Sequence, residues 1–275
     1  MLYLVGTPIG NLDDISPRAC EILRSADVIA CEDTRVTGIL LSSLGITGKR
    51  LIAYHEHNKA ASGNGILDML KSGLTVAQVS DAGMPAISDP GADLASLASA
   101  NDIEVSVIPG PSAVTAALSV SGLDTRYFHF EGFLPSEGSS RRTRLKALTL
   151  IGETIVLYEA PHRLRKLLYE LVDTGFGDRR IALCRELTKR YEEVLRMTVN
   201  ESVEYYKANE PRGEFCLCLE PLEQKKCVGG DGAGDPMKLI ELLKEKGMSS
   251  KDISVVVSEY TGMNKKEAYK AASEM

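Results

Sequence analysis

Residues 76–91 read Val76-Ala-Gln-Val-Ser-Asp-Ala-Gly-Met-Pro-Ala-Ile-Ser-Asp-Pro-Gly91, which joins a short apolar run to a loop of unusual composition. The run predicts a buried strand over residues 76–80, because it is short and bounded by turn-forming residues. The loop holds two acids, two prolines and two glycines, more than a plain turn needs. Ligand sites of α/β proteins lie at the carboxyl ends of strands. We therefore predict a binding site at the end of this strand.

Similar apolar runs recur on both sides of this stretch and alternate with amphipathic segments. They predict strands over residues 2–5, 28–31, 51–54 and 105–108. The first helix is predicted to begin at Ser16 and Pro17, because serine caps helices well and proline suits the first helical position. This alternation indicates a mainly parallel sheet with helices on both faces. Residues 1–120 are therefore predicted to form an N-terminal α/β domain.

A second α/β domain is predicted over residues 121–223. Its expected strands are residues 127–130, 154–158, 181–184 and 215–219, and its expected helices are residues 142–150 and 163–171. A further strand-like segment over residues 194–199 favours a mixed sheet.

The C-terminal part differs in composition from the rest of the chain. Four glycines fall within residues 224–235, which are predicted to form a flexible linker. Residues 236–275 are predicted to form a helix-turn-helix-like appendage of three short helices, residues 237–246, 252–260 and 265–273. Such an appendage binds protein or nucleic acid, or packs on its parent.

Composition excludes several classes of protein. The chain has 275 residues, of which 44% are hydrophobic and 25% charged, so it can bury a sizeable core. The net charge of −6 argues against a general nucleic-acid coat, and the absence of tryptophan argues against an aromatic base-stacking platform. Lys and Arg nevertheless outnumber Asp and Glu in residues 126–190. This segment is either a local phosphate-binding surface or ordinary surface charge.

The six cysteines indicate neither a zinc site nor a disulfide framework, because none of them forms a C-x-x-C pair. Cys216 and Cys218 alternate with apolar residues on one face of an expected strand. The sequence has no signal-peptide pattern and no apolar run of membrane-spanning length. We therefore expect a cytoplasmic protein with reduced thiols and no membrane partner.

Two further loops follow predicted strands at the same sheet edge. Residues 5–11 read Val-Gly-Thr-Pro-Ile-Gly-Asn, which is neither a dinucleotide fingerprint nor a P-loop. This loop is either a tight turn or a ligand loop. Residues 109–113 read Pro-Gly-Pro-Ser-Ala, where Ser112 could cap the next helix or let a ligand lie against backbone amides.

Together and in this order, the three loops resemble those of the tetrapyrrole methylase superfamily, which transfers methyl groups from S-adenosylmethionine (SAM). More narrowly, the sequence resembles the bacterial 16S ribosomal RNA 2′-O-methyltransferase I family. The segments that carry this narrower resemblance are residues 32–35, 55–58, 81–91, 109–113, 130–135, 157–163 and 185–189, with Glu192 and Glu193. The match runs from residue 1 to about residue 220, and the helical tail also fits. Met84 departs from the family pattern, which has threonine there.

The resemblance implies a class III SAM methyltransferase fold with two α/β domains and the cofactor in the cleft between them. It implies methylation of the ribose 2′-hydroxyl of a decoding-centre cytidine in 16S rRNA by a homodimer. The substrate is either naked rRNA or, as expected here, the assembled 30S subunit. The cofactor-binding residues that it implies are Pro8, Asp81, Ala82, Gly83, Met84, Ser112, Ala113 and Tyr158.

Methyl transfer depends on in-line positioning of oxygen, carbon and sulfur. A ribose hydroxyl is a weak nucleophile and gains from a group that accepts its proton. The candidate catalytic residues are Asp33, Arg35, His55, Glu56, His57, Glu186 and Lys189. Their residue types do not single out the proton acceptor, and Lys189 could serve only with a lowered pKa.

Each of these candidates also has a structural interpretation. Asp33 and Arg35 could simply form a salt bridge. His55 and His57 are expected on one strand face, but two histidines are too few ligands for a metal site, so no metal is expected.

Several basic side chains are candidates for binding RNA phosphates. They are Arg141, Arg142, Arg144, Arg163, Arg185, Lys265, Lys266 and Lys270. The arginines of residues 141–144 and the lysines of the last helix could equally be solvated helix faces.

Two other functions stay open. The first is another methylase of the same fold, of the precorrin or diphthine type, although a small tetrapyrrole needs neither the tail nor the basic segment. The second is a ligand-sensing regulator that binds nucleic acid without catalysis. Sheet-edge loops from both domains favour an enzyme over this second alternative.

Overall fold

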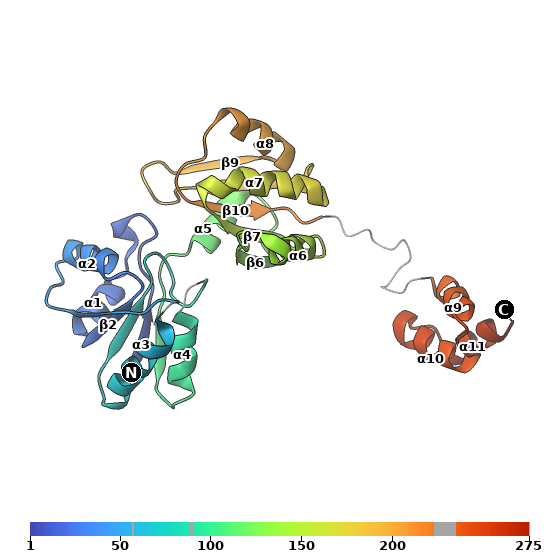
Figure 1. Cartoon of the computed structure of the whole chain (residues 1–275), viewed down its shortest axis with the longest axis horizontal. Coiled ribbons are helices and arrows are strands. Elements are labelled where there is room, and N and C mark those ends of the chain that lie inside the picture. Colours follow the sequence, from blue (N-terminus) through green and yellow to red (C-terminus); the bar gives the residue numbers. More distant parts are fainter. Residues whose placement is uncertain (57, 89–90, 223–234, 275) are drawn as a thin grey trace. The chain divides into compact units, whose positions relative to one another are not determined.

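The computed structural model of the chain describes residues 1–56, 58–88, 91–222 and 235–274. The chain divides into two compact units, residues 1–222 and residues 223–275 (Figure 1). The predicted linker over residues 224–235 lies, except for Asp235, outside the described residues.

The first half of the larger unit is built on a five-stranded parallel sheet with strand order β3-β2-β4-β1-β5. The strands are β1 (Leu2–Val5), β2 (Val28–Cys31), β3 (Arg50–Ala53), β4 (Val76–Val79) and β5 (Val105–Ile108). Every pairing is parallel, with Leu2 of β1 opposite both Val76 and Val105. The predicted parallel sheet is confirmed, and its carboxyl ends meet at one edge.

Helices cover both faces of this sheet. They are α1 (Pro17–Ser25), α2 (Thr34–Ser43), α3 (Lys59–Lys71) and α4 (Gly91–Ser99), with a short 3-10 turn at Leu12–Asp14. On one face α1 and α2 bury Leu23 and Leu41 against the strands, and on the other face α3 and α4 bury Ile66 and Leu94. The Ser16 hydroxyl accepts a hydrogen bond from the Ala19 N–H, which confirms the predicted cap of α1.

The second half is built on a mixed sheet with strand order β6-β7-β10-β8-β9. The strands are β6 (Phe128–Phe133), β7 (Thr154–Glu159), β8 (Arg180–Arg185), β9 (Glu193–Thr198) and β10 (Phe215–Leu219). Only β6 and β7 pair in parallel, and the other three pairings are antiparallel. The predicted mixed sheet is therefore confirmed. β6 extends to residue 133, beyond the predicted end at residue 130, because the pairing with β7 resumes at Gly132 after a β-bulge between Phe130 and Gly132.

Two layers cover this second sheet. One face packs against α6 (Gly138–Leu148), α7 (Pro161–Leu171) and α8 (Val199–Ala208), with a π-helical turn at Val172–Phe176. The other face, which includes Cys216 and Cys218, packs against α5 (Ala113–Ser121). Because α5 directly follows β5 of the first sheet, this packing joins the two halves into one unit.

The smaller unit contains α9 (Pro236–Glu245), α10 (Ser250–Thr261) and α11 (Lys265–Glu274). Its core is formed by the buried side chains Ile240, Ile253, Val257, Ala268 and Ala272. Asp235 caps α9 and Ser249 caps α10. Among the described residues, no helix is both long enough and apolar enough to cross a membrane.

Candidate active site

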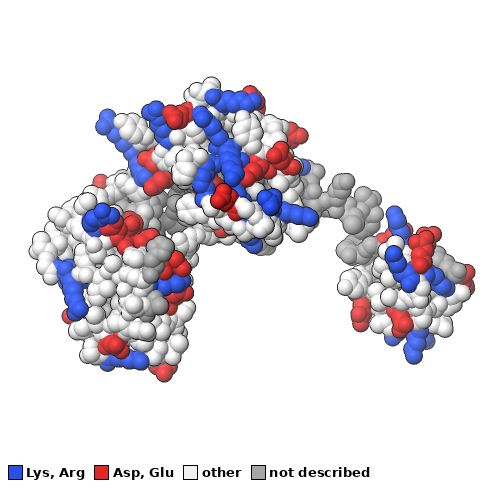
Figure 2. All heavy atoms as spheres, in the orientation of Figure 1, with Lys and Arg blue, Asp and Glu red and all other residues white. Residues whose placement is uncertain are grey.

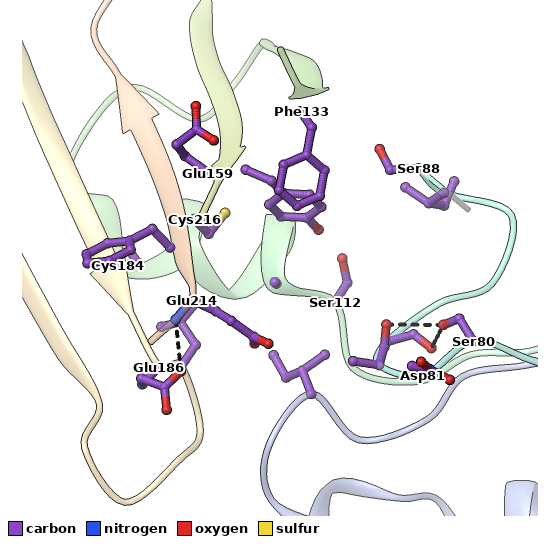
Figure 3. Close-up of a pocket in the computed structure, with 18 of the residues that line it drawn as sticks. Ser80, Asp81, Ser88, Ser112, Phe133, Glu159, Cys184, Glu186, Glu214 and Cys216 are labelled. Carbon is purple, nitrogen blue, oxygen red and sulfur yellow. Dashed lines mark hydrogen bonds between the residues drawn. The ribbon is translucent and has the colours of Figure 1, made fainter. Parts of the chain in front are cut away.

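A cavity of about 570 Å³ lies between the two sheets of the larger unit, within the range usual for small-molecule sites (Figure 3). The first half lines it with Ile9, Glu32, residues 80–84, Ile87, Ser88, Ser112 and Ala113. The second half lines it with Phe133, residues 158–161, Cys184, Glu186, Leu187, Lys189 and residues 214–216. The cavity therefore lies at the predicted carboxyl edge of the first sheet.

The three loops that follow β1, β4 and β5 are packed directly on one another. A Cβ atom added to Gly6 would lie 2.7 Å from Gly110 Cα, so these two backbones meet at a distance that only glycine permits. Thr7 and Gly83 exchange two backbone hydrogen bonds, of 2.9 and 3.2 Å. The buried Thr7 hydroxyl also donates to the Ser80 carbonyl. This packing fixes the floor of the cavity.

Seven of the eight residues predicted to bind the cofactor line this cavity. They are Asp81, Ala82, Gly83, Met84, Ser112, Ala113 and Tyr158. Pro8 does not line it, and its neighbour Ile9 does. Within the described residues, the Ser112 side chain makes no capping hydrogen bond to α5. The start of this helix therefore faces the cavity without the side-chain cap that the sequence allowed.

Aromatic side chains form one wall of the cavity. The Tyr158 ring contacts the rings of Phe130 and Phe133, with centroids 5.2 and 5.4 Å apart. Burial raises the pKa of Tyr158 to about 12, despite a backbone hydrogen bond at Val114. The phenol therefore stays neutral at physiological pH and offers an apolar face with one polar tip.

Behind this wall lies a buried ion-pair network. Glu159, which is 2% exposed, pairs with Arg163 at 2.9 Å and lies 3.7 Å from Arg141. Arg141 also pairs with Glu170 at 2.7 Å. The two arginines donate to the carbonyls of Pro135 and Leu134, and so connect the loop after β6 to the turn after β7. The network holds the backbone beside Tyr158 in place.

A second charged cluster lines the cavity at residues 186, 189 and 214. Lys189 Nζ is 3.0 Å from Glu186 Oε1 and 2.9 Å from Glu214 Oε2. Burial alone would lower the pKa of Lys189, but its hydrogen bonds to the two glutamates outweigh burial and raise it. The lowered pKa that Lys189 would need to act as a base is therefore not found.

Backbone strain and glycine contacts show that this cluster has a fixed geometry. Glu186 and Thr188 adopt φ angles of 53° and 65°, a left-handed conformation that costs non-glycine residues roughly 1–3 kcal/mol each. A Cβ atom on Gly10 would lie 2.3 Å from Lys189 Cγ, and one on Gly213 would lie 2.6 Å from Glu186 Cγ. Two glycines thus make room for the two charged side chains.

Asp33 and Arg35 form a salt bridge, which was the structural alternative to a catalytic role. Asp33 caps α2 by accepting the Arg35 N–H, and its carboxylate receives the Arg35 guanidinium at 2.6 and 3.1 Å. These hydrogen bonds lower the pKa of Asp33 to about 2. Glu32, next to Asp33, lines the cavity, whereas Asp33 does not.

His55 and Glu56 do not line the cavity. His55 and Glu56 follow the end of β3 in a loop, so the expected placement of His55 on a strand face is wrong. Glu56 pairs with Lys59 at 2.8 Å. His57 lies outside the described residues. No group of three or more potential metal ligands occurs in the described parts of the chain.

The basic residues predicted to bind RNA fall into different environments. Arg141 is 2% exposed, so its prediction as a phosphate ligand is wrong, because its charge is already used inside the protein. Arg142, one residue later on α6, is exposed. Arg144 makes two hydrogen bonds to Glu131, of 2.7 and 2.5 Å.

The remaining basic candidates are also dispersed. Arg163 belongs to the buried network, and Arg185 pairs with Glu193 at 3.1 Å. The exposed lysines of α11 belong to the smaller unit and are Lys265, Lys266 and Lys270. Figure 2 shows Lys and Arg interspersed with Asp and Glu on the visible face, rather than gathered in one patch.

Several residues that line the cavity were not predicted from the sequence. Glu32 directly follows β2 and Glu159 is the last residue of β7, and both strands were predicted from the sequence. A search for acidic residues at the ends of predicted strands would therefore have found both glutamates. Glu214 precedes β10, and the amino end of that strand reaches the cavity only because β10 runs antiparallel to β7. That placement depends on strand order, which the local sequence does not reveal.

The charge of the lining favours a cationic ligand. The lining holds the ammonium group of Lys189 and five carboxylates, which belong to Glu32, Asp81, Glu159, Glu186 and Glu214. Arg163 and Arg141 offset the charge of Glu159 from behind the wall, and negative charge still exceeds positive charge. A ligand that carries positive charge and an aromatic ring fits such a lining, whereas a phosphate group inside it would be repelled.

Known proteins are similar to this chain in sequence and in fold. A family model described as tetrapyrrole (corrin/porphyrin) methylases matches residues 1–202. The chain is 42% identical to the ribosomal RNA small subunit methyltransferase I of Mesorhizobium japonicum, over 100% of this chain and 92% of that protein. It is 43% identical to the protein of the same name from Halalkalibacterium halodurans, over 98% and 93% of the two chains. Uroporphyrin-III C-methyltransferase from Thermus thermophilus, complexed with S-adenosylhomocysteine, has the same fold, with a TM-score of 0.58, 18% identity and coverage of 80% and 96%.

Proposed function

The chain belongs to the ribosomal RNA small subunit methyltransferase I family of the tetrapyrrole methylases, and we propose that it transfers the methyl group of SAM to the 2′-hydroxyl of a decoding-centre cytidine in 16S rRNA. The observation that supports this proposal most strongly is the cavity between the two sheets. The floor of this cavity is formed by the three loops that follow β1, β4 and β5, and the residues that line it are mostly acidic among the charged ones. The proposed location is the cytoplasm, where ribosomal subunits are present.

The cavity has the chemistry that SAM requires. When bound, SAM supplies a methyl group activated by a positively charged sulfonium. Asp81 and the backbone of residues 82–84 would hold the polar part of the cofactor, and Tyr158 and Phe133 offer aromatic faces to its adenine. The start of α5 at Ser112 and Ala113, which has no side-chain cap, would present its backbone N–H groups to an anionic group.

The chain's own contribution to catalysis is positioning. A methyl transfer gains most when the attacking oxygen is held in line with the reacting carbon, which can supply several kcal/mol of the barrier reduction. Because the acidic lining repels phosphates, we propose that only the ribose of the target nucleotide enters the cavity. The flanking phosphates would stay outside, near exposed cations such as Arg142 and the lysines of α11.

We propose the assembled 30S subunit as the substrate and a homodimer as the active form. A methylation assay with radiolabelled SAM tests this function, using 30S subunits, deproteinised 16S rRNA and uroporphyrinogen as alternative acceptors. We expect label in the 16S rRNA of 30S subunits and none in the tetrapyrrole. Label in the tetrapyrrole alone would refute the proposal, and light scattering of the same sample tests the dimer.

A further inference from the structure

The cluster of Glu186, Lys189 and Glu214 contains two carboxylates in different situations. The Glu186 side chain is only 18% exposed, and its Oε1 atom accepts from both Lys189 Nζ and the Glu214 N–H. The Glu214 side chain is 78% exposed, and Lys189 binds only its Oε2 atom. Among the described residues, Glu214 Oε1 has no hydrogen-bond or ion-pair partner.

Glu214 is also directed toward the cofactor loops. Figure 3 shows its side chain extending from the start of β10 toward the side of the cavity where Ser112 and Asp81 lie. In the same view, Glu186 lies farther from those two residues. Of the two carboxylates, Glu214 is therefore the one that extends toward the cofactor loops.

We propose that Glu214 is the catalytic residue that accepts the proton of the ribose 2′-hydroxyl. The inference rests on the proposed function. The hydroxyl oxygen forms a bond to the methyl carbon while the carbon–sulfur bond breaks, and the electron pair of that bond remains on sulfur. The hydroxyl proton moves to Glu214 Oε1. The products are a methylated ribose, a neutral thioether and a protonated carboxyl group, which later loses its proton to water.

Lys189 acts as a positioning residue in this scheme. Its raised pKa keeps it protonated, so it does not compete for the proton. By binding Glu214 Oε2, it restricts the rotation of an exposed side chain and leaves Oε1 available. Gly10 makes this arrangement possible, because any larger residue would occupy the space of the Lys189 stem.

The Glu214→Gln variant tests the proposal, because glutamine keeps the shape and an acceptor for Lys189 but is not a base. We expect the single-turnover methylation rate on 30S subunits to fall about 10²–10⁴-fold. The affinity for SAM, measured by calorimetry, should change less than threefold. The matched control is Glu204→Gln on α8, where a similarly exposed glutamate pairs with Lys207 away from the cavity, and its rate should equal that of the wild type.

A pH profile separates a proton acceptor from a structural residue. The wild-type rate should depend on pH through the group that accepts the hydroxyl proton, and the Glu214→Gln variant should lose that dependence. Formate should partly restore the rate of a Glu214→Ala variant. A Glu214→Gln rate within threefold of the wild type would overturn the inference while leaving the proposed function standing. Failure of the wild type to methylate 16S rRNA would instead overturn the proposed function.

Discussion

The backbone N–H of Asp33 donates a hydrogen bond to Oδ1 of Asp81, with 3.1 Å between nitrogen and oxygen. The bond connects the start of α2 to the loop after β4, whose residues 81–84 line the cavity. It therefore links the neighbouring strands β2 and β4 at their carboxyl ends. Asp33 contributes to the site by positioning Asp81, while its own carboxylate is engaged by Arg35.

Replacement of Asp81 by alanine should weaken SAM binding and leave the fold intact. Loss of a hydrogen bond to a charged group costs about 1.5–3 kcal/mol, so the dissociation constant should rise roughly tenfold to a hundredfold. Calorimetric titration measures this change. Asp93→Ala is the control, because Asp93 pairs with Lys59 outside the cavity and its loss should not alter SAM affinity. Unchanged affinity in a folded Asp81→Ala protein would refute the placement of the cofactor.

Replacement of Gly110 by alanine should both destabilise the protein and weaken cofactor binding. The added Cβ would lie 2.8 Å from Gly6 Cα, so the loops after β1 and β5 must move apart. Such overpacking costs about 1–3 kcal/mol, which denaturant titration measures. Gly38→Ala on α2 is the opposite case, because its Cβ meets nothing within 4 Å. That control should be neutral or gain about 0.5–1 kcal/mol. Equal stability of the two variants would contradict the close packing of the loops.

Arg141 and Arg142 are adjacent but should behave differently. Arg141→Ala removes one of the two arginines beside the buried Glu159, which keeps its pair with Arg163, and should cost about 1–3 kcal/mol of unfolding free energy. Arg142→Ala should change stability by less than about 0.5 kcal/mol. If Arg142 contacts an RNA phosphate, its loss should reduce the slope of log affinity against log salt by about 1. A stable Arg141→Ala protein would show that the buried network is not needed.

The pair of Asp33 and Arg35 should make stability depend on pH in the acid range. The pKa of Asp33 in the folded protein is about 2, below its ordinary value of 3.8. Its stabilising effect is therefore complete above pH 3.8 and is lost as the pH falls toward 2. Asp33→Asn keeps an acceptor for the helix cap, so it should be less stable than the wild type near neutral pH, and the difference should shrink in acid. A difference that stays constant with pH would contradict this pairing.

Truncation at Gly230 should leave SAM binding intact and reduce methylation of ribosomal subunits. All the residues that line the cavity lie before residue 217, and the smaller unit has its own core. If the lysines of α11 bind substrate, KM should rise before kcat falls. Wild-type kinetics of the truncated protein on 30S subunits would exclude a role for the tail in substrate binding.

The parts of the site that could be predicted from the sequence are the loops that directly follow a predicted strand. The loop of residues 81–84 directly follows a buried strand, and the parallel arrangement of such strands brings their ends together. The burial of Arg141 was not predictable in the same way, because its partners Glu159 and Glu170 lie on other elements. The role of Glu214 and the raised pKa of Lys189 likewise arise only when antiparallel strands bring residues 186, 189 and 214 together.

The position of the methyl group on the nucleoside tests the central claim most directly. After reaction with 30S subunits, 16S rRNA can be digested to nucleosides and measured by mass spectrometry, with fragmentation separating methylated ribose from methylated base. We expect one 2′-O-methylcytidine per 16S rRNA, dependent on SAM. A methyl group on the cytosine base, or none in the RNA, would contradict the proposed function.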